Sequence, residues 1–346
     1  MMHPRILVTG AGSGVGQGII KSLQSSSLEP TVISADITPF NAALYRTKEA
    51  FLIPRVEEFE ALERLVELIL KNKIDIVMIG SEFDLNFFAA NKERIEKETK
   101  ALVVVSPQKT VEIADDKWLT SQFLKEADLP YPQSVCPHTL EEAINAAKDF
   151  EFPFVLKTRR GTSNRHVHII ENEESLRRHY PTVPMPMLQE MLNKPSSKLS
   201  SEYTCSVFKT KESKLMGPFT ARRTLRHGNS WVIEVDHFRD IYPLLLKIGE
   251  SLSIMGSLNV QLMKSSRGYV PFEFNSRFSG TTAVRTHFGF NEPEMAVRNY
   301  FFHENLQNPS IRKGMCFRYL EEIFLEGVNE NQLEQAFSKG DVRPWF

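Results

Sequence analysis

The chain has 346 residues, of which 41% are hydrophobic and 25% are charged, as in an ordinary soluble protein that is long enough for two or three domains. Its 42 basic and 43 acidic residues leave a net charge of −1, and this balance excludes the basic surplus of a nucleic-acid-binding protein. The apolar runs are strand-sized, the N-terminus leads into a strand rather than a signal peptide, and the three cysteines are far apart, so we expect no membrane span, free thiols and a cytoplasmic protein.

The first hundred residues alternate between strand and helix patterns. A helix is expected at 59–72, where Leu62, Leu65 and Ile69 share one face. Buried strands are expected at 5–9, 31–35, 74–79 and 101–106. This repeated β–α–β pattern predicts a parallel sheet in a Rossmann-like domain over residues 1–110.

A glycine-rich turn, Gly10–Gly16, follows the first strand, and Asp36 ends the second. Strand, glycine turn, helix and acidic residue in this order are typical of dinucleotide-binding domains, so an NAD(P)-dependent oxidoreductase is one alternative function. The turn also resembles that of short-chain dehydrogenases, but the chain has no Tyr-x-x-x-Lys pair and no Gly-x-x-x-x-Gly-Lys-Ser/Thr loop. We favour a tight connection between strand and helix that lines a substrate cleft.

Residues 107–127 are expected to form one helix that begins near Pro107, because proline suits the first turn of a helix. Leu129–Pro132 ends this helix. Lys117 lies within it, directly after two aspartates. Taken alone, this position favours a solvated helix lysine.

Residues 152–157 and 166–170 are expected to form a pair of strands, with Lys157 at the end of the first. The loop between them, Thr158–Arg165, carries three arginines and a single glycine, Gly161. Backbone N–H groups and cations in such a loop suit a polyphosphate. The arginines are expected to supply the charge, although the loop is poor in glycine.

Two further strands are expected at 186–192 and 201–208. Met191 and Leu192, in the first, suit either a core strand or the face of a purine ring. Glu202 opens the second, and a carboxylate is a good acceptor for the hydroxyls of a diol.

Three arginines, Arg222, Arg223 and Arg226, follow in the next segment. They could bind an anionic substrate or a transferred phosphate, or they could be solvated strand residues, and the sequence favours neither alternative. Amphipathic spacing predicts a helix at 242–254. Another helix is expected to begin at 280–285, where its N-terminal amides could receive an anion.

A hairpin over residues 256–282 carries the most informative pattern, because alternation along its strands separates two faces. The polar face consists of Asn259, Gln261, Glu273, Asn275 and Arg277. The apolar face consists of Leu258, Val260, Leu262, Val270, Phe272, Phe274 and Phe278. Carboxylate and amide oxygens suit Mg²⁺, and an arginine beside them can bind phosphate oxygens. The alternative is an ordinary half-exposed hairpin.

The order Gln261…Glu273-x-Asn275-x-Arg277 resembles the magnesium-binding strands of ATP-grasp enzymes, in particular the branch close to the carbamoyl phosphate synthase large subunit. The resemblance covers roughly residues 107–285 and implies an ATP-grasp fold of two subdomains behind the Rossmann-like domain. It implies metal ligands at Gln261, Glu273 and Asn275. It also implies nucleotide contacts at Lys117, Lys157, Glu190, Met191, Leu192 and Glu202, and a contact to phosphate or acyl phosphate by Arg277. Arg277 is therefore one candidate catalytic residue, and Arg222 is taken as the second because of its charge.

The fold class expected from this resemblance is α/β, with an α+β second half. Its domains would be 1–110, a small subdomain 111–186, a large subdomain with the metal site 187–325, and a tail 326–346. The implied activity is that of an ADP-forming ligase, with ATP and two Mg²⁺ ions, which Mn²⁺ could replace. The implied substrates are a small carboxylate and an amine, the chain could form a homodimer, and neither nucleic acid nor membrane is a partner.

Carbamoyl phosphate synthesis itself is not expected, because the chain carries one ATP-grasp unit and no glutaminase is visible. Two alternatives remain open at this point. One is the NAD(P)-dependent oxidoreductase, and the other is a nucleotide-binding regulator without turnover, for which the glycine-poor loop leaves room.

Overall fold

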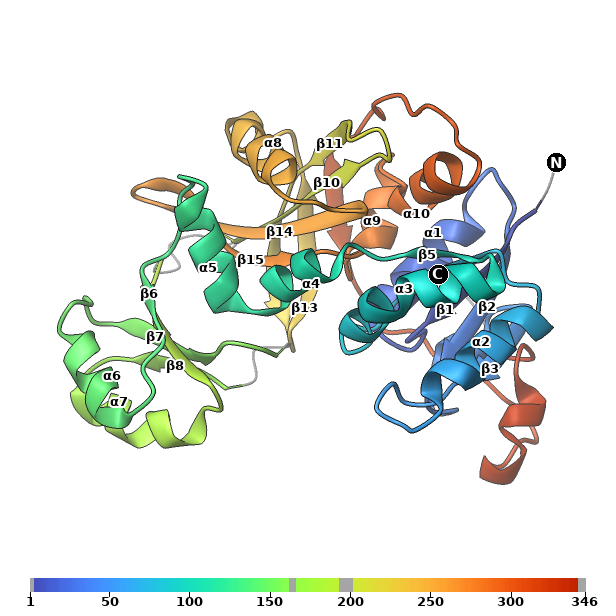
Figure 1. Ribbon diagram of the computed structural model, residues 1–346, viewed down its shortest axis with the longest axis horizontal. Coiled ribbons are helices and arrows are strands. Elements are labelled where there is room, and N and C mark those ends of the chain that lie inside the picture. Colours follow the sequence, from blue (N-terminus) through green and yellow to red (C-terminus); the bar gives the residue numbers. More distant parts are fainter. Residues whose placement is uncertain (1–2, 162–165, 193–201, 342–346) are drawn as a thin grey trace.

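The computed structural model describes residues 3–161, 166–192 and 202–341, which form three sheets with helices packed against them (Figure 1). The first sheet is parallel and has five strands, whereas the other two are antiparallel, with four and seven strands. This mixed α/β architecture agrees with the expected fold class. Within the described residues, no helix combines the length and apolarity that crossing a membrane requires.

The parallel sheet belongs to the first domain and has the strand order β3-β2-β1-β4-β5. Its strands are β1 (Arg5–Thr9), β2 (Thr31–Asp36), β3 (Glu49–Leu52), β4 (Ile76–Ile79) and β5 (Leu102–Val104). Its helices are α1 (Gly14–Gln24), α2 (Ala61–Lys71) and α3 (Leu85–Thr99). The expected Rossmann-like arrangement is confirmed. The sequence prediction missed β3, a four-residue edge strand with no buried side chain.

The glycine turn of this domain is closed by contacts of its own. A Cβ atom on Gly16 would lie 2.3 Å from the carbonyl oxygen of Gly10, so only glycine lets α1 approach β1 this closely. The Asp36 carboxylate accepts a hydrogen bond of 2.8 Å from the N–H of Gly12. The acidic residue therefore fastens the turn, and the turn serves packing as well as lining a cleft.

The prediction of a single helix over residues 107–127 is wrong. The chain forms two helices, α4 (Gln108–Asp115) and α5 (Lys117–Glu126), separated by Asp116. Asp116 is extended, and its side chain accepts hydrogen bonds from two backbone N–H groups of α5. Such capping starts a new helix where apolar spacing alone shows no interruption. The break places Lys117 in the first turn of α5.

The four-stranded sheet forms the smaller part of the second half, at the lower left of Figure 1. Its strands, in the order β6-β9-β7-β8, are β6 (Ser134–Val135), β9 (Pro186–Gln189), β7 (Phe154–Thr158) and β8 (Val167–Ile170). Its helices are α6 (Leu140–Ala147) and α7 (Glu173–His179). The boundaries expected after residues 110 and 186 fall inside α4 and β9, so both need correction. All of β9 belongs to this sheet.

The seven-stranded sheet has the order β15-β14-β10-β12-β13-β16, with β11 paired to β10. Its strands are β10 (Glu202–Lys209), β11 (Leu215–Phe219), β12 (Ala221–Arg226), β13 (Asn229–Val235), β14 (Gly256–Ser265), β15 (Gly268–Asn275) and β16 (Gly314–Phe317). Its helices are α8 (Tyr242–Ser251), α9 (Thr282–His287) and α10 (Glu292–Ala296).

One apolar core joins the first domain to the larger sheet. Ile6 and Ile19 of the first domain belong to the same buried cluster as Phe208 and Phe219 of the larger sheet. Helices α9 and α10 both pack on α1. The smaller sheet has a separate core, which its strands form with α6 and α7.

The hairpin of β14 and β15 contains a β-bulge that the alternation pattern does not reveal. Gln261 pairs with Glu273, but its neighbour Leu262 pairs with Pro271, so Phe272 is an extra residue. Phe272 consequently turns to the same side as Glu273, and its expected place on the apolar face is wrong. Proline suits this site because it has no N–H group to donate to the ladder.

The segment after β16 packs against the first domain rather than forming a free arm. Phe324 and Asp341 form an isolated β-bridge, and the ring of Phe337 lies 5.7 Å from that of Tyr45. In Figure 1 this red segment lies beside β3.

Phe274 provides a test of the hairpin's packing on α5. Its ring is 1% exposed and lies 6.1 Å from that of Phe123. Phe274→Ala should lower the free energy of unfolding by about 3–5 kcal/mol, because it leaves a cavity in the core. Urea denaturation followed by circular dichroism measures the change. Phe59, which is 92% exposed, is the control, and Phe59→Ala should change stability by no more than about 0.5 kcal/mol. Equal losses in the two variants would contradict the packing.

Candidate functional site

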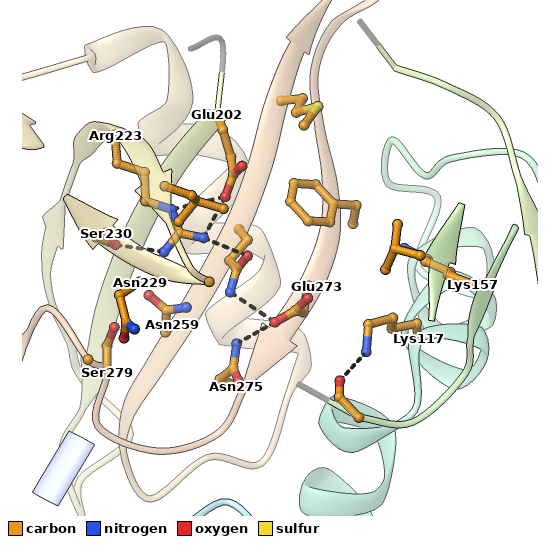
Figure 2. A pocket seen from close by; sticks show the side chains of 18 of the residues that line it. Lys117, Lys157, Glu202, Arg223, Asn229, Ser230, Asn259, Glu273, Asn275 and Ser279 are labelled. Carbon is orange, nitrogen blue, oxygen red and sulfur yellow. Dashed lines mark hydrogen bonds and ion pairs between the residues drawn. The ribbon is translucent and has the colours of Figure 1, made fainter. Parts of the chain in front are cut away.

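A cavity of about 620 Å³ lies where the smaller sheet, the larger sheet and the first domain meet. Figure 2 shows side chains from opposite walls turned toward one another across it. It brings together ten of the eleven residues that the sequence singles out: Lys117, Lys157, Glu190, Met191, Leu192, Glu202, Gln261, Glu273, Asn275 and Arg277. Arg222 is the exception.

A chain of hydrogen bonds crosses the floor of the cavity from β10 to β15. Arg223 donates to Glu202 Oε1 at 2.5 Å and to Gln261 Oε1 at 2.8 Å. Gln261 donates in turn to Glu273 Oε1 at 2.9 Å, and Asn275 donates to the same oxygen at 3.3 Å. Four strands thus hold one carboxylate in a fixed orientation (Figure 2).

Arg222 lies outside this chain and does not line the cavity. Its guanidinium pairs with Glu234 at 2.5 Å. Successive side chains of a strand point to opposite faces, so Arg222 and Arg223 cannot both reach the cavity, and the structure places Arg223 there. The choice of Arg222 as the site arginine is therefore corrected. The parity of β12 could have excluded one of the two neighbours, but it could not show which face is the inner one.

Two lysines face the floor from the opposite wall. The buried Lys157 donates to Gln189 Oε1 at 2.7 Å and lies 5.8 Å from the centre of the Phe272 ring. Lys117 donates to the carbonyl oxygen of Gly161 at 2.9 Å. Among the described residues neither lysine forms an ion pair. Burial, assisted by the charge of Lys117, lowers the pKa of Lys157 to about 8. This wall therefore favours an anionic ligand.

Arg159 and Arg160, which follow β7, both have partners within the protein. Arg159 pairs with Asp116 at 2.7 Å, and Arg160 lies 3.6 Å from the same carboxylate. They fasten the base of the loop to the junction of α4 and α5. Their expected contribution of charge to a polyphosphate is thus not what the structure shows. Residues 162–165, with the third arginine Arg165, lie outside the described part of the chain.

One end of the cavity is apolar. Val155 and Ile169 line it from the smaller sheet, and Met263 and Phe272 line it from the larger one. Glu190, at the rim, accepts a hydrogen bond of 2.8 Å from the N–H of Gln133 and pairs with Arg267. Met191 and Leu192 follow it along the same wall.

The other end of the cavity reaches the glycine turn of the first domain and also contains two charged groups that the sequence did not reveal, Glu82 and Arg318. Gly14 and Glu82 line it from that domain, and Arg318 lines it from the segment after β16. Arg277 pairs with Glu82 at 3.0 Å, and Arg318 donates to the carbonyl oxygen of Gly280. Glu82 and Arg318 lie far from the hairpin in the sequence, so no local pattern connects them with it.

The oxygen atoms on the floor suit a divalent cation. Glu273 supplies a carboxylate, and Gln261 and Asn275 supply amide oxygens beside it, which are ligands that Mg²⁺ accepts. The described residues contain no cluster of three or more His, Cys, Asp or Glu side chains that could hold a metal. A cation here would therefore depend on a single carboxylate, two amides and the ligand's own oxygens.

Comparison with known proteins covers most of the chain. Residues 6–103 match the family model described as PylC-like, N-terminal domain, and residues 114–281 match the model described as ATP-grasp domain. The carbamoyl phosphate synthase arginine-specific large chain of Cutaneotrichosporon cutaneum is 24% identical over 305 residues, which are 81% of this chain and 25% of that protein. The corresponding large chain of Helicobacter pylori strain J99 is 23% identical over 80% of this chain and 27% of that protein. This chain thus spans about a quarter of the length of these relatives.

Two solved structures share the fold. The biotin carboxylase domain of the Hydrogenobacter thermophilus 2-oxoglutarate carboxylase, in complex with MgADP, ADP and bicarbonate, has a TM-score of 0.70 at 19% identity, covering 91% of this chain and 74% of that one. The N5-carboxyaminoimidazole synthetase of Staphylococcus aureus, complexed with ADP, has a TM-score of 0.72 at 15% identity, covering 92% and 82%. None of these matches supports the oxidoreductase alternative.

The lowered pKa of Lys157 predicts a dependence of stability on pH in the absence of ligands. The folded protein holds this lysine with a pKa of about 8, against 10.5 for an ordinary lysine, so the unfolded chain binds more protons between these pH values. The free energy of unfolding of the wild type should therefore rise relative to that of Lys157→Met as the pH increases from about 8 to 10.5. Urea titrations at intervals of one pH unit measure the difference, and a constant difference would contradict the assignment.

Proposed function

We propose that this chain, which belongs to the ATP-grasp family, is an ATP- and Mg²⁺-dependent, ADP-forming ligase that activates a small carboxylate as an acyl phosphate for attack by an amine or another nucleophile. The observation that carries the proposal is the arrangement of one cavity. A carboxylate and two amides, held by the Arg223 chain, face two lysines that have no anionic partner among the described residues.

The nucleotide is proposed to lie along the cavity with its base at the apolar end. Ile169 and Met263, from opposite sheets, would cover the faces of the ring, and the segment 190–192 would follow its edge. Glu202, on the floor, would accept hydrogen bonds from the ribose hydroxyls. The phosphates would then lie between the two lysines and Glu273, where cations and a metal-binding carboxylate face each other.

Mg²⁺ fits the floor chemically, with Gln261, Glu273 and Asn275 as its protein ligands. When bound, it would offset the negative charge of the phosphates and of the phosphoryl group in transfer. Two ions, and replacement of Mg²⁺ by Mn²⁺, belong to the proposal as well. The chain itself would contribute the fixed orientation of these ligands, because Arg223 and Glu202 hold Gln261 in place.

The acid substrate is proposed to bind at the end next to the first domain, near Arg277 and Arg318. A carboxylate oxygen there would attack the terminal phosphorus, ADP would leave, and the nucleophile would then displace phosphate from the acyl phosphate. Bicarbonate, present in one of the similar structures, shows the size of acid that a member of this fold can hold. An amine as the second substrate and the formation of a homodimer stay predictions.

Release of ADP tests the proposed reaction. Pairs of small carboxylic acids and amines are incubated with MgATP, and ADP release is expected only when an acid is present. Glu273→Ala should lower this release by at least about a hundredfold, because the loss of metal-supported charge stabilisation is worth several kcal/mol. Its circular dichroism spectrum should stay that of the wild type. The matched control is Glu250→Ala on the exposed side of α8, which should change neither property. Unchanged ADP release in Glu273→Ala would contradict the site.

Variants of the two neighbouring arginines of β12 test which face of the sheet forms the floor of the cavity. Arg223→Lys should weaken MgADP binding by about tenfold or more, because lysine cannot hold Glu202 and Gln261 together as the planar guanidinium does. Arg222→Lys should leave the affinity within about twofold, since its partner Glu234 lies outside the cavity. Isothermal titration calorimetry measures both. A larger loss in Arg222→Lys would show that the faces have been assigned the wrong way round.

A further inference from the structure

A fully buried ion pair lies beside the cavity, on the same face of β14 as Asn259 and Gln261. Arg285 of α9 and Glu292 of α10 are both 0% exposed, and their charged groups lie 3.0 Å apart. Glu292 also accepts hydrogen bonds from the hydroxyls of Ser206 at 2.6 Å and Ser257 at 2.5 Å. The carboxylate is thus saturated, and one end of Arg285 is fixed.

The other end of Arg285 reaches a residue of the cavity. Its Nη2 donates to Asn259 Oδ1 at 2.5 Å, and the hydroxyl of Thr204 donates to the same oxygen at 2.9 Å. Asn259 is only 2% exposed, yet it lines the cavity. Two donors on one atom identify that atom as the amide oxygen.

This arrangement leaves the NH₂ group of Asn259 directed at the cavity. Figure 2 shows its nitrogen turned toward Glu273 and Asn275. No described residue accepts a hydrogen bond from this nitrogen, and the nitrogen is not among the buried polar atoms without a partner. Among the described residues it is therefore a donor without an acceptor, at the wall of the cavity.

We propose that Asn259 donates a hydrogen bond to an oxygen of the terminal phosphoryl group of the nucleotide. The buried Arg285–Glu292 pair positions Asn259 by keeping its NH₂ group directed at the cavity. The inference rests on the proposed nucleotide site. Asn259 pairs with Asn275 in the β14–β15 ladder, on the side of the metal-binding floor away from the apolar end. The phosphoryl group farthest from the base is the one that reaches it.

Energetic reasoning supports a positioning role for the ion pair. Removing two charges from water opposes their mutual attraction, so a buried pair usually adds little net stability over an apolar pair of the same size. The contribution of the ion pair is then to select one orientation of the groups that it contacts. Here the guanidinium rejects the flipped amide, because the flip would direct the NH₂ group at two donors. A flipped Asn259 would present its oxygen to the phosphate, so that two acceptors would face each other with no proton between them.

The test compares the binding of MgADP with that of the magnesium complex of AMPPNP, an ATP analogue with a terminal phosphoryl group, by isothermal titration calorimetry. Asn259→Asp keeps the acceptor for Arg285 and Thr204 but replaces the inward NH₂ group by oxygen. AMPPNP affinity should fall by at least about tenfold, the effect of losing a hydrogen bond to a charged group, while ADP affinity changes by less than about threefold. If Asn259 instead acted as a metal ligand, the added carboxylate would strengthen both complexes.

The ion pair is tested by the double variant Arg285→Met with Glu292→Leu, which leaves no buried charge unpaired. The same selective loss for AMPPNP is expected, with an unchanged circular dichroism spectrum. The matched control replaces the neighbouring pair, Arg298→Met with Glu294→Leu, whose groups lie 2.8 Å apart and outside the cavity; neither affinity should change. Equal losses for both nucleotides in Asn259→Asp would overturn the inference alone. A wild type that binds neither nucleotide would overturn the proposed function and this inference together.

Discussion

The guanidinium of Arg223 is the interaction on which the floor of the cavity depends. It is nearly buried, and it compensates the burial of Glu202 while holding the side chain of Gln261. Through Gln261 it determines how Glu273 is presented. A single planar cation on β12 thereby fixes the orientation of side chains on three other strands, directly or through Gln261. Each of these strands has its own packing, so the polar groups would not find a common orientation without a shared partner.

The polar face of the hairpin could be predicted from the sequence because it depends on strand alternation, which is a local property. The position of Phe272 could not, because a bulge beside Pro271 reverses the parity on one side of it. The same limit applied to Arg222 and Arg223, where alternation separates the two residues but only the assembled sheet shows which one faces inward. The break at Asp116 was also hidden, since apolar spacing continues across it.

The remaining parts of the cavity come from distant segments, and the sequence carries no signal that would assemble them. Glu82 follows a strand of the parallel sheet, and Arg318 follows the last strand of the larger sheet. Asn259 lies on the predicted polar face of the hairpin, but nothing local in the sequence marks its amide as a ligand contact. Its significance comes from Arg285, whose approach depends on how α9 and α10 pack together beside the cavity.

The core that joins the first domain to the larger sheet has a consequence for engineering. Ile6 and Ile19 share their cluster with Phe208 and Phe219, so a fragment that begins at α4 would expose a wide apolar surface to water and would be prone to aggregate. The first domain is therefore not a detachable module, although its strands form a complete sheet. Chimeras that exchange nucleotide-binding units between proteins of this kind would need to carry both the first domain and the larger sheet. The interface between α1, α9 and α10 would have to be preserved.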